Sequence, residues 1–188
     1  MKKIIKMLAF LVVAVSLTGC LSTEKKEYSY KVNGDGSGSG KIKFVNIISQ
    51  KDDGKDVSFS DFGELVDKYL NGEQFETDNP NLVVTDKKLY EEDGKLMGEV
   101  TFTFKSLSDI NFIMEPGCDC SPIFYPMSTF SETFESSNGT YLGENSSATM
   151  IKWPSGTKEF TFTTVVTSDL TETVSLLGMY KTWKESNK

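Results

Sequence analysis

The chain has 188 residues, with 27 acidic residues against 20 lysines, and it contains neither arginine nor histidine. The absence of histidine excludes Ser-His-Asp and Cys-His catalysis and removes imidazole as a metal ligand. The absence of arginine and the net charge of −7 argue against nucleic acid as a partner, because nucleic-acid binding depends on neutralising phosphates. The composition therefore favours a binding or structural role over catalysis, and we expect no cofactor.

The first 19 residues are typical of an export leader. Lys2, Lys3 and Lys6 make a positive N-terminal region, and residues 7–15 form an apolar run. A run of this length is too short to span a bilayer and fits the apolar part of a secretory signal peptide. We therefore expect a signal peptide over residues 1–19 and an extracytoplasmic location for the rest of the chain.

Leu17-Thr18-Gly19-Cys20, at the end of the leader, resembles the lipobox of bacterial lipoproteins. The resemblance implies that Cys20 becomes the mature N-terminus and carries lipid, and two or three acyl chains make a durable membrane anchor. Leu21 stands where some lipoproteins carry the aspartate that retains them in the inner membrane, which favours the outer membrane or the cell surface. The alternative is an ordinary signal peptide, or an uncleaved anchor that contains a cysteine.

Beyond the leader we expect a flexible tether over residues 20–27, because this segment is short, polar and charged. Residues 28–185 are expected to form a single α+β domain, mainly antiparallel β hairpins with one or two packed helices. Without the leader, 17 lysines face 27 acidic residues, a balance of −10. The first expected hairpin joins strands at residues 28–32 and 41–48 through a glycine-rich turn.

Helix and hairpin patterns alternate along the rest of the domain. An apolar stripe at helical spacing predicts a helix over residues 61–70, which Asn71-Gly72 ends. Residues 81–90 and 95–104 alternate in polarity and predict a hairpin. Residues 148–153 and 158–166 predict another. The expected residues of the apolar stripe are Phe62, Leu65, Val66, Tyr69 and Leu70.

The C-terminal segment has two interpretations. Asp169 and Glu172 resemble a capping pair that begins a last helix. A strand through Val174, Leu176 and Gly178 is the competing interpretation. Residues 105–135 carry several prolines and aromatic residues, so we expect an irregular segment that packs on the β core or contacts a partner.

The glycine-rich turn offers a weak candidate metal site. Asp35, Ser37 and Ser39 occupy the first, third and fifth positions of a segment that resembles a calcium-binding EF-hand loop. Asn46 stands where that loop needs a bidentate glutamate, and the flanking residues have strand patterns. We therefore interpret the segment as a hairpin turn and expect no metal, with a calcium-stabilised adhesion or assembly component as an alternative.

Cys118 and Cys120 remain once Cys20 is assigned to lipid. An even pair in an oxidising compartment suggests a disulfide bond. Two free, partly buried thiols are a second interpretation, and a redox or metal role is a third. The sequence leaves all three open.

Acidic residues cluster in two places, at residues 73–78 and at residues 91–93. A pair of carboxylates can perform general acid/base hydrolysis, so an extracytoplasmic hydrolase is an alternative function. Runs of acids are more typical of solvated loop tips, and we assign no catalytic residue.

The order of lipobox, Asp-Gly-Ser element, helix and strand over residues 20–112 resembles LppM-like envelope lipoproteins, whose function is unassigned. This resemblance implies a membrane-associated α+β module that contacts lipid or glycolipid. We expect a lipid-anchored, non-catalytic binding or structural module of the cell envelope. Its membrane contact would be through acylated Cys20, and its partner a lipid, a glycan or an envelope protein.

Overall fold

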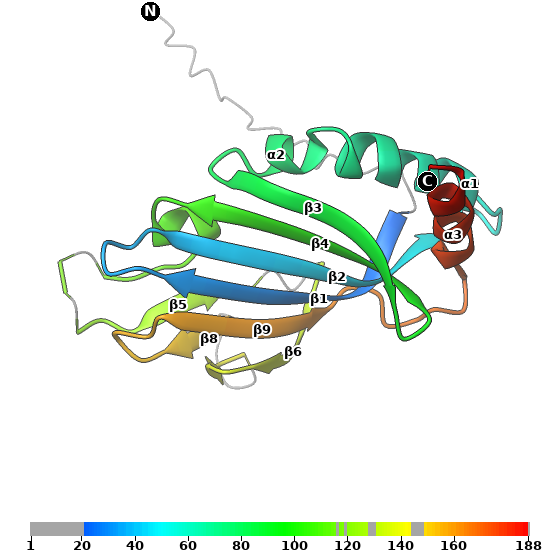
Figure 1. Ribbon diagram of the computed structural model, residues 1–188. Coiled ribbons are helices and arrows are strands. Elements are labelled where there is room, and N and C mark those ends of the chain that lie inside the picture. The colour runs from blue at the N-terminus through cyan, green and yellow to red at the C-terminus, as the bar shows by residue number, and fades with distance from the viewer. Residues whose placement is uncertain (1–20, 116, 119, 128–130, 144–148, 188) are drawn as a thin grey trace, which may run out of the picture.

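A computed structural model describes residues 21–115, 117–118, 120–127, 131–143 and 149–187. The fold is α+β, as the sequence predicts: two antiparallel sheets are accompanied by short helices (Figure 1). Among the residues that the structure describes, no helix has the length and apolar character needed to cross a membrane.

The main sheet has seven strands in the order β3-β4-β2-β1-β9-β6, with β10 beside the end of β2. Its strands are β1 (Leu21–Val32), β2 (Gly38–Gln50), β3 (Val83–Glu92), β4 (Lys95–Phe104), β6 (Thr133–Ser137), β9 (Glu159–Val165) and β10 (Thr173–Ser175). The small sheet has the order β5-β8-β7, from β5 (Ile123–Pro126), β7 (Thr140–Tyr141) and β8 (Met150–Trp153).

The helical elements are short. α1 (Ser58–Glu64) continues directly into the π-helical η1 (Leu65–Leu70), and α2 (Gln74–Asp78) follows. The 3-10 helix η2 (Leu107–Ile110) follows β4, and α3 (Leu177–Ser186) ends the described chain beside α1. Figure 1 shows the segment from α1 to α2 running along the main sheet.

One face of the main sheet is apolar and covered, and the other is polar. Alternate residues of its central strands are buried: Tyr28 and Tyr30 of β1, Phe102 and Phe104 of β4, and Phe160 and Phe162 of β9. The opposite face carries charged pairs such as Lys88 with Glu99, whose atoms are 2.7 Å apart. An antiparallel sheet with this division buries one side and leaves the other to solvent.

Two separate apolar clusters lie on the covered face. The large cluster joins the main sheet to the small sheet and to α2, with Tyr30, Phe102, Phe112 and Trp153 among its members. The helical cluster joins α1, η1 and α3 to β2 and β4 through residues such as Leu65, Leu96 and Tyr180. Phe44 of β2 packs against both.

Glycine is required on β2 because aromatic rings of neighbouring strands lie over it. A Cβ atom at Gly40 would be 2.5 Å from Phe102 Cε2 and 2.9 Å from Tyr30 Cδ1. The rings therefore occupy the space that a side chain would take, and the central strands pack closely at this point.

The expected tether is wrong for residues 21–27. These residues form the first half of β1 and pair with β2, with Leu21 opposite Ser49 and Lys25 opposite Val45. Some of their polar side chains are partly exposed to solvent, and others make hydrogen bonds within the protein. The hydroxyl of Thr23, for example, donates to Val45 O at 2.6 Å. Polarity alone therefore did not indicate flexibility, and the strand that we expected at residues 28–32 begins seven residues earlier.

The hairpin expected from residues 148–153 and 158–166 is also wrong. Both strands exist, but β8 pairs with β5 and β7 in the small sheet, whereas β9 pairs with β1 and β6 in the main sheet. The turn between them carries the chain from one sheet to the other. A strand pattern with a good turn therefore did not identify the pairing partner.

At the C-terminus each interpretation is partly right. Residues 173–175 form β10, and the helix begins only at Leu177. Asp169 caps no helix, because its carboxylate accepts hydrogen bonds from the backbone and hydroxyl of Thr171 in a turn. The hairpin of β3 and β4 is confirmed, with Asp93 and Gly94 both at positive φ in its turn, and the helix expected over residues 61–70 is confirmed within α1 and η1.

Candidate functional site

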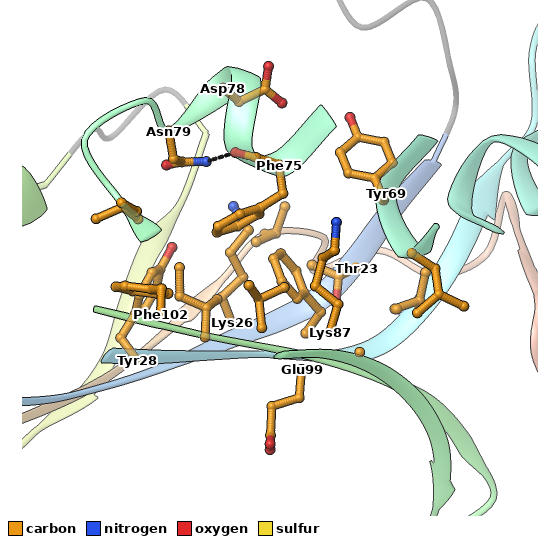
Figure 2. Close-up of a pocket in the computed structure, with 18 of the residues that line it drawn as sticks. Thr23, Lys26, Tyr28, Tyr69, Phe75, Asp78, Asn79, Lys87, Glu99 and Phe102 are labelled. Carbon is orange, nitrogen blue, oxygen red and sulfur yellow. Dashed lines mark hydrogen bonds between the residues drawn. The ribbon is translucent and has the colours of Figure 1, made fainter. Parts of the chain in front are cut away.

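A cavity of about 560 Å³ lies between the main sheet and the segment from η1 to α2, in the gap between the two clusters (Figure 2). Ile42 and Phe44 of β2 and Val100 of β4 form its floor. Tyr69 of η1 and Phe75 of α2 lie on the helical side. The lining is predominantly apolar, as in cavities that hold small molecules.

The floor is open although it belongs to the middle of the sheet. Ile42 and Phe44 are only partly buried, whereas the neighbouring Phe102 is fully buried. Phe75 packs on Phe102 with ring centroids 6.4 Å apart, so the helical segment touches the sheet at its α2 end. The sheet between that contact and the helical cluster stays uncovered, which leaves the cavity.

A β-bulge directs Lys87 into the cavity. The register of β3 against β4 shifts between Val84 and Asp86. After the shift, Lys87 lies opposite Val100 and shares the covered face with Val84 and Leu89. Its ammonium group donates to Gly72 O at 2.5 Å and lies 2.9 Å from Glu76 Oε1, so it joins the sheet to the helical segment. Figure 2 shows the Lys87 side chain extending from the sheet toward that segment.

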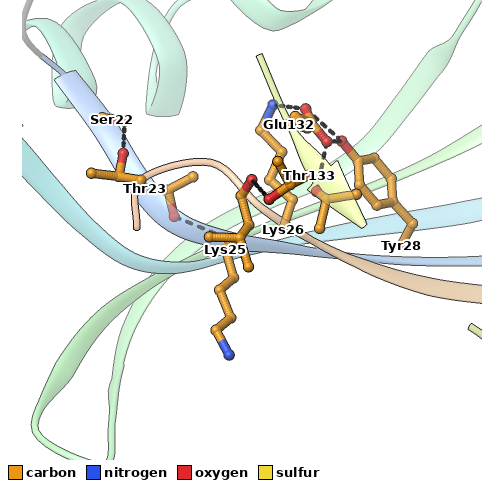
Figure 3. Close-up of polar contacts among 10 residues, drawn as sticks. Ser22, Thr23, Lys25, Lys26, Tyr28, Glu132 and Thr133 are labelled. Carbon is orange, nitrogen blue, oxygen red and sulfur yellow. Dashed lines mark hydrogen bonds and ion pairs between the residues drawn. The ribbon is translucent and has the colours of Figure 1, made fainter. Parts of the chain in front are cut away.

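Another lysine at the cavity, Lys26, belongs to a network around the partly buried carboxylate of Glu132 (Figure 3). Lys26 Nζ lies 2.6 Å from Glu132 Oε1. The hydroxyl of Thr164 donates to Oε2 at 2.6 Å, and the hydroxyl of Tyr28 donates to the same oxygen at 3.0 Å. Lys25, the neighbour of Lys26, points to the other side of the sheet (Figure 3).

The environment of Glu132 favours its ionised form. Burial alone would raise the pKa of this carboxyl, but the charge of Lys26 and the hydrogen bonds from Lys26, Thr164 and Tyr28 outweigh it and lower the pKa. The carboxylate is therefore a stable counter-ion for Lys26. It is already bonded on both oxygens, which suits a structural role rather than a general acid.

Three tyrosines beside the cavity are held in their neutral form. Burial raises the pKa of Tyr125 to about 12, and burial together with the charge of Glu132 raises the pKa of Tyr28. Burial also raises the pKa of Tyr30 well above its ordinary value. All three act as apolar walls with a hydroxyl at one end.

The chain reaches the cavity at its first described residues. Leu21, Ser22 and Thr23 of β1 line it, and Leu21 also packs against the helical cluster. Cys20, the residue expected to carry lipid, lies outside the described residues but is bonded directly to Leu21. The expected anchor is thus one peptide unit from the cavity.

The weak calcium candidate is folded as a hairpin turn. The Asp35 carboxylate accepts hydrogen bonds from the backbone and hydroxyl of Ser37, at 3.0 and 2.6 Å. Ser39 already belongs to β2, where it pairs with Lys31. Within the described part of the chain, no three His, Cys, Asp or Glu side chains come together as ligands for a metal ion.

The sulfur atoms of Cys118 and Cys120 form a disulfide bond, with Cα atoms 5.1 Å apart. Neither cysteine lines the cavity. The bond closes a local turn, where Ser121 N donates to Cys118 O at 3.0 Å.

The two acidic clusters are engaged with lysines or face solvent. Glu91 pairs with Lys181 on α3, and Glu76 pairs with Lys87. Asp93 is exposed in the turn between β3 and β4. These contacts give Glu76 and Glu91 structural partners, and Asp78 of the first cluster lies at the cavity.

No protein-family model matches the chain, and no curated protein or solved structure matches it either. The function is therefore argued from the leader and the cavity.

The sequence did not reveal the cavity. Ile42 and Phe44 have the alternation of any core strand, and only the folded arrangement leaves them uncovered. Lys87 could not be placed either, because the bulge that turns it inward has no glycine or proline to mark it.

Proposed function

We propose that this protein is a lipid-anchored binding module of the bacterial cell envelope, without catalytic activity, and that its cavity holds the apolar part of a lipid-like ligand. The anchor rests on the resemblance of Leu17-Thr18-Gly19-Cys20 to a lipobox. The same resemblance supports an extracytoplasmic location at the outer membrane or the cell surface.

The observation that carries the binding function is the uncovered floor of the cavity. Ile42 and Phe44 are apolar side chains on a central strand, where burial is the usual fate. Leaving them accessible costs about 25 cal/mol per Å² of apolar surface, so an apolar occupant recovers stability that the free protein lacks. The volume of about 560 Å³ falls within the range of roughly 300–1,000 Å³ typical of ligand sites.

The charges around the cavity favour an amphiphile. Lys26 and Lys87 bring ammonium groups to a predominantly apolar lining that also includes Asp78 and Asp109, and each lysine already has a carboxylate partner. An anionic or zwitterionic head group at the rim can share these lysines without leaving a charge unpaired. The expected ligand therefore has one apolar chain and a polar head.

The binding function is tested with a soluble single-chain amphiphile, lysophosphatidylcholine below its micellar concentration, and a fluorescent apolar probe that it displaces. Ile42→Trp fills the floor and is expected to weaken binding by about tenfold or more. Lys41→Trp is the matched control, because Lys41 is the adjacent residue of β2 on the exposed polar face. Equal affinities for the two variants and the unsubstituted protein would contradict the proposal.

The anchor is tested separately in cells. Labelled palmitate should be incorporated into the protein in a manner that depends on Cys20. Cys20→Ala should abolish the label and leave the leader uncleaved. A labelled Cys20→Ala protein, or an unlabelled natural one, would contradict the anchor.

A further inference from the structure

We infer that the cavity takes up one acyl chain of a bilayer phospholipid directly from the membrane to which Cys20 is anchored, because β1 leaves no spacer between anchor and cavity. This inference rests on the proposed function. The ligand would come from the bilayer itself and would enter the cavity at its Leu21 end.

The first step is the position of the anchor. Leu21, the residue that follows Cys20 in the sequence, lines the cavity. Leu21 is held in the main sheet opposite Ser49, and Ser22 donates to or accepts from Thr167 Oγ1 at 2.8 Å. The domain cannot move away from an anchored Cys20 without unpairing the start of β1.

A second observation is an exposed aromatic side chain on α1, the helix that contacts β1 and β2. Ser49, the partner of Leu21, donates to the carboxylate of Asp61 on α1 at 2.6 Å, with both side chains buried. Phe59, two residues earlier on α1, is 86% exposed and is the most exposed large apolar side chain among the described residues. An exposed aromatic ring is suited to the interfacial region of a bilayer.

The third step identifies the occupant. An acyl chain that crosses water exposes its methylene groups, and each exposed methylene is unfavourable. A cavity whose lining begins one residue from the anchor removes most of that crossing, since the chain passes from one apolar medium into another. A bilayer phospholipid is the amphiphile present at that place in the highest amount, and its head group can remain at the rim near Lys26.

The test uses the full lipidated protein in phospholipid vesicles that contain a phospholipid with a photoactivatable group in its acyl chain. Illumination should attach this chain to residues of the cavity floor, such as Ile42 and Val100, as identified by mass spectrometry of the peptides. A Gly-Ser linker of about 12 residues between Cys20 and Leu21, which spans roughly 20 Å, should reduce this labelling by about fivefold or more.

The matched control carries the same linker between Gly34 and Asp35, two exposed residues of the turn between β1 and β2. It should be labelled like the natural protein. Binding of soluble lysophosphatidylcholine should be equal in all three proteins, which shows that each has an intact cavity.

Several results would overturn the inference while leaving the binding function in place. One is labelling that does not change with the linker between Cys20 and Leu21. Another is a protein that binds the soluble amphiphile but is not labelled at the floor. A third is the finding that the protein's own Cys20 lipid occupies the cavity, seen as a cross-link within one chain. Failure of all three proteins to bind the soluble amphiphile would instead contradict the proposed function.

Discussion

Trp153 donates its indole N–H to Asn138 Oδ1 across 2.7 Å, and this bond joins the two sheets. Trp153 is 1% exposed and belongs to β8 of the small sheet. The same Asn138 oxygen accepts from Thr161 N at 3.0 Å, and Asn138 Nδ2 donates to Glu159 O, both on β9 of the main sheet. A single amide side chain therefore ties the small sheet to the face on which it packs.

Asn138→Ala should destabilise the protein by about 1–3 kcal/mol, because it leaves the buried indole N–H without an acceptor. Urea unfolding followed by tryptophan fluorescence measures the loss. Asn33→Ala is the control, since Asn33 makes its side-chain bond to Ser37 in an exposed turn, and its effect should stay within about 0.5 kcal/mol. Similar midpoints for the two variants would contradict the role of Asn138.

Gly40→Ala should destabilise the protein by about 1–3 kcal/mol through overpacking. The new Cβ would lie 2.5 Å from Phe102 Cε2, so a ring in the large cluster would have to move. Gly34→Ala is the matched control, because nothing lies within 4 Å of a Cβ there. Chemical denaturation of both variants measures the difference in the free energy of unfolding. A Gly40→Ala protein as stable as the control would contradict the prediction, because the rings of Phe102 and Tyr30 would then move at no cost.

The stability that Glu132 provides should depend on pH in a defined direction. The pKa of Glu132 is lowered from its ordinary value of 4.5 in the folded protein. Its contribution is therefore fully present above pH 4.5 and is lost as the pH falls through the lowered, folded-state pKa. Glu132→Gln should cost about 1–3 kcal/mol at pH 7, and the difference from the natural protein should shrink as the pH falls below 4.5.

The control for this prediction is Glu135→Gln. Glu135 pairs with Lys25 at 2.5 Å on the more exposed side of β1, where an ion pair contributes little. Its substitution should change the free energy of unfolding by less than about 1 kcal/mol at pH 7. A Glu132→Gln deficit that stays constant down to pH 2.5 would rule out the ionised carboxylate as its cause.

Reduction of the bond between Cys118 and Cys120 should change the global stability by less than about 2 kcal/mol, because a bridge between residues two apart closes only a very short loop in the unfolded chain. Urea unfolding with and without reductant measures this, with Cys118→Ser/Cys120→Ser as the variant without the bond. A large loss on reduction would mean that the turn supports the fold far more than its length suggests.

Local chemistry carried the successful predictions of the fold. The helix over residues 61–70 follows from an apolar stripe at helical spacing, and the hairpin of β3 and β4 follows from alternation around Asp93 and Gly94. In both cases the residues that make the element stabilise it directly, so neighbours in sequence contain the information. The α+β fold class follows from the sum of such elements.

Predictions failed where the outcome depends on partners far away in the sequence. β8 does not pair with β9, because Ile151 and Trp153 complete the large cluster from the small sheet. No pattern within either strand indicates this arrangement. Residues 21–27 are ordered by β2 and β9, although their own composition is that of a linker. The cavity could not be predicted from the sequence for the same reason, because its floor and its helical side belong to elements that are separate in the sequence.

The pairing of β1 with β9 has a consequence for how the protein is made. Residues 25–31 pair with residues 159–165, so one of the two neighbours of β1 is synthesised almost last, whereas the other, β2, follows β1 directly. Contacts between such distant residues are slow to form. A chain that emerges from its N-terminus therefore cannot close its main sheet until nearly all of it has been released. Until then, the edge of β1 that faces β9 has no strand beside it.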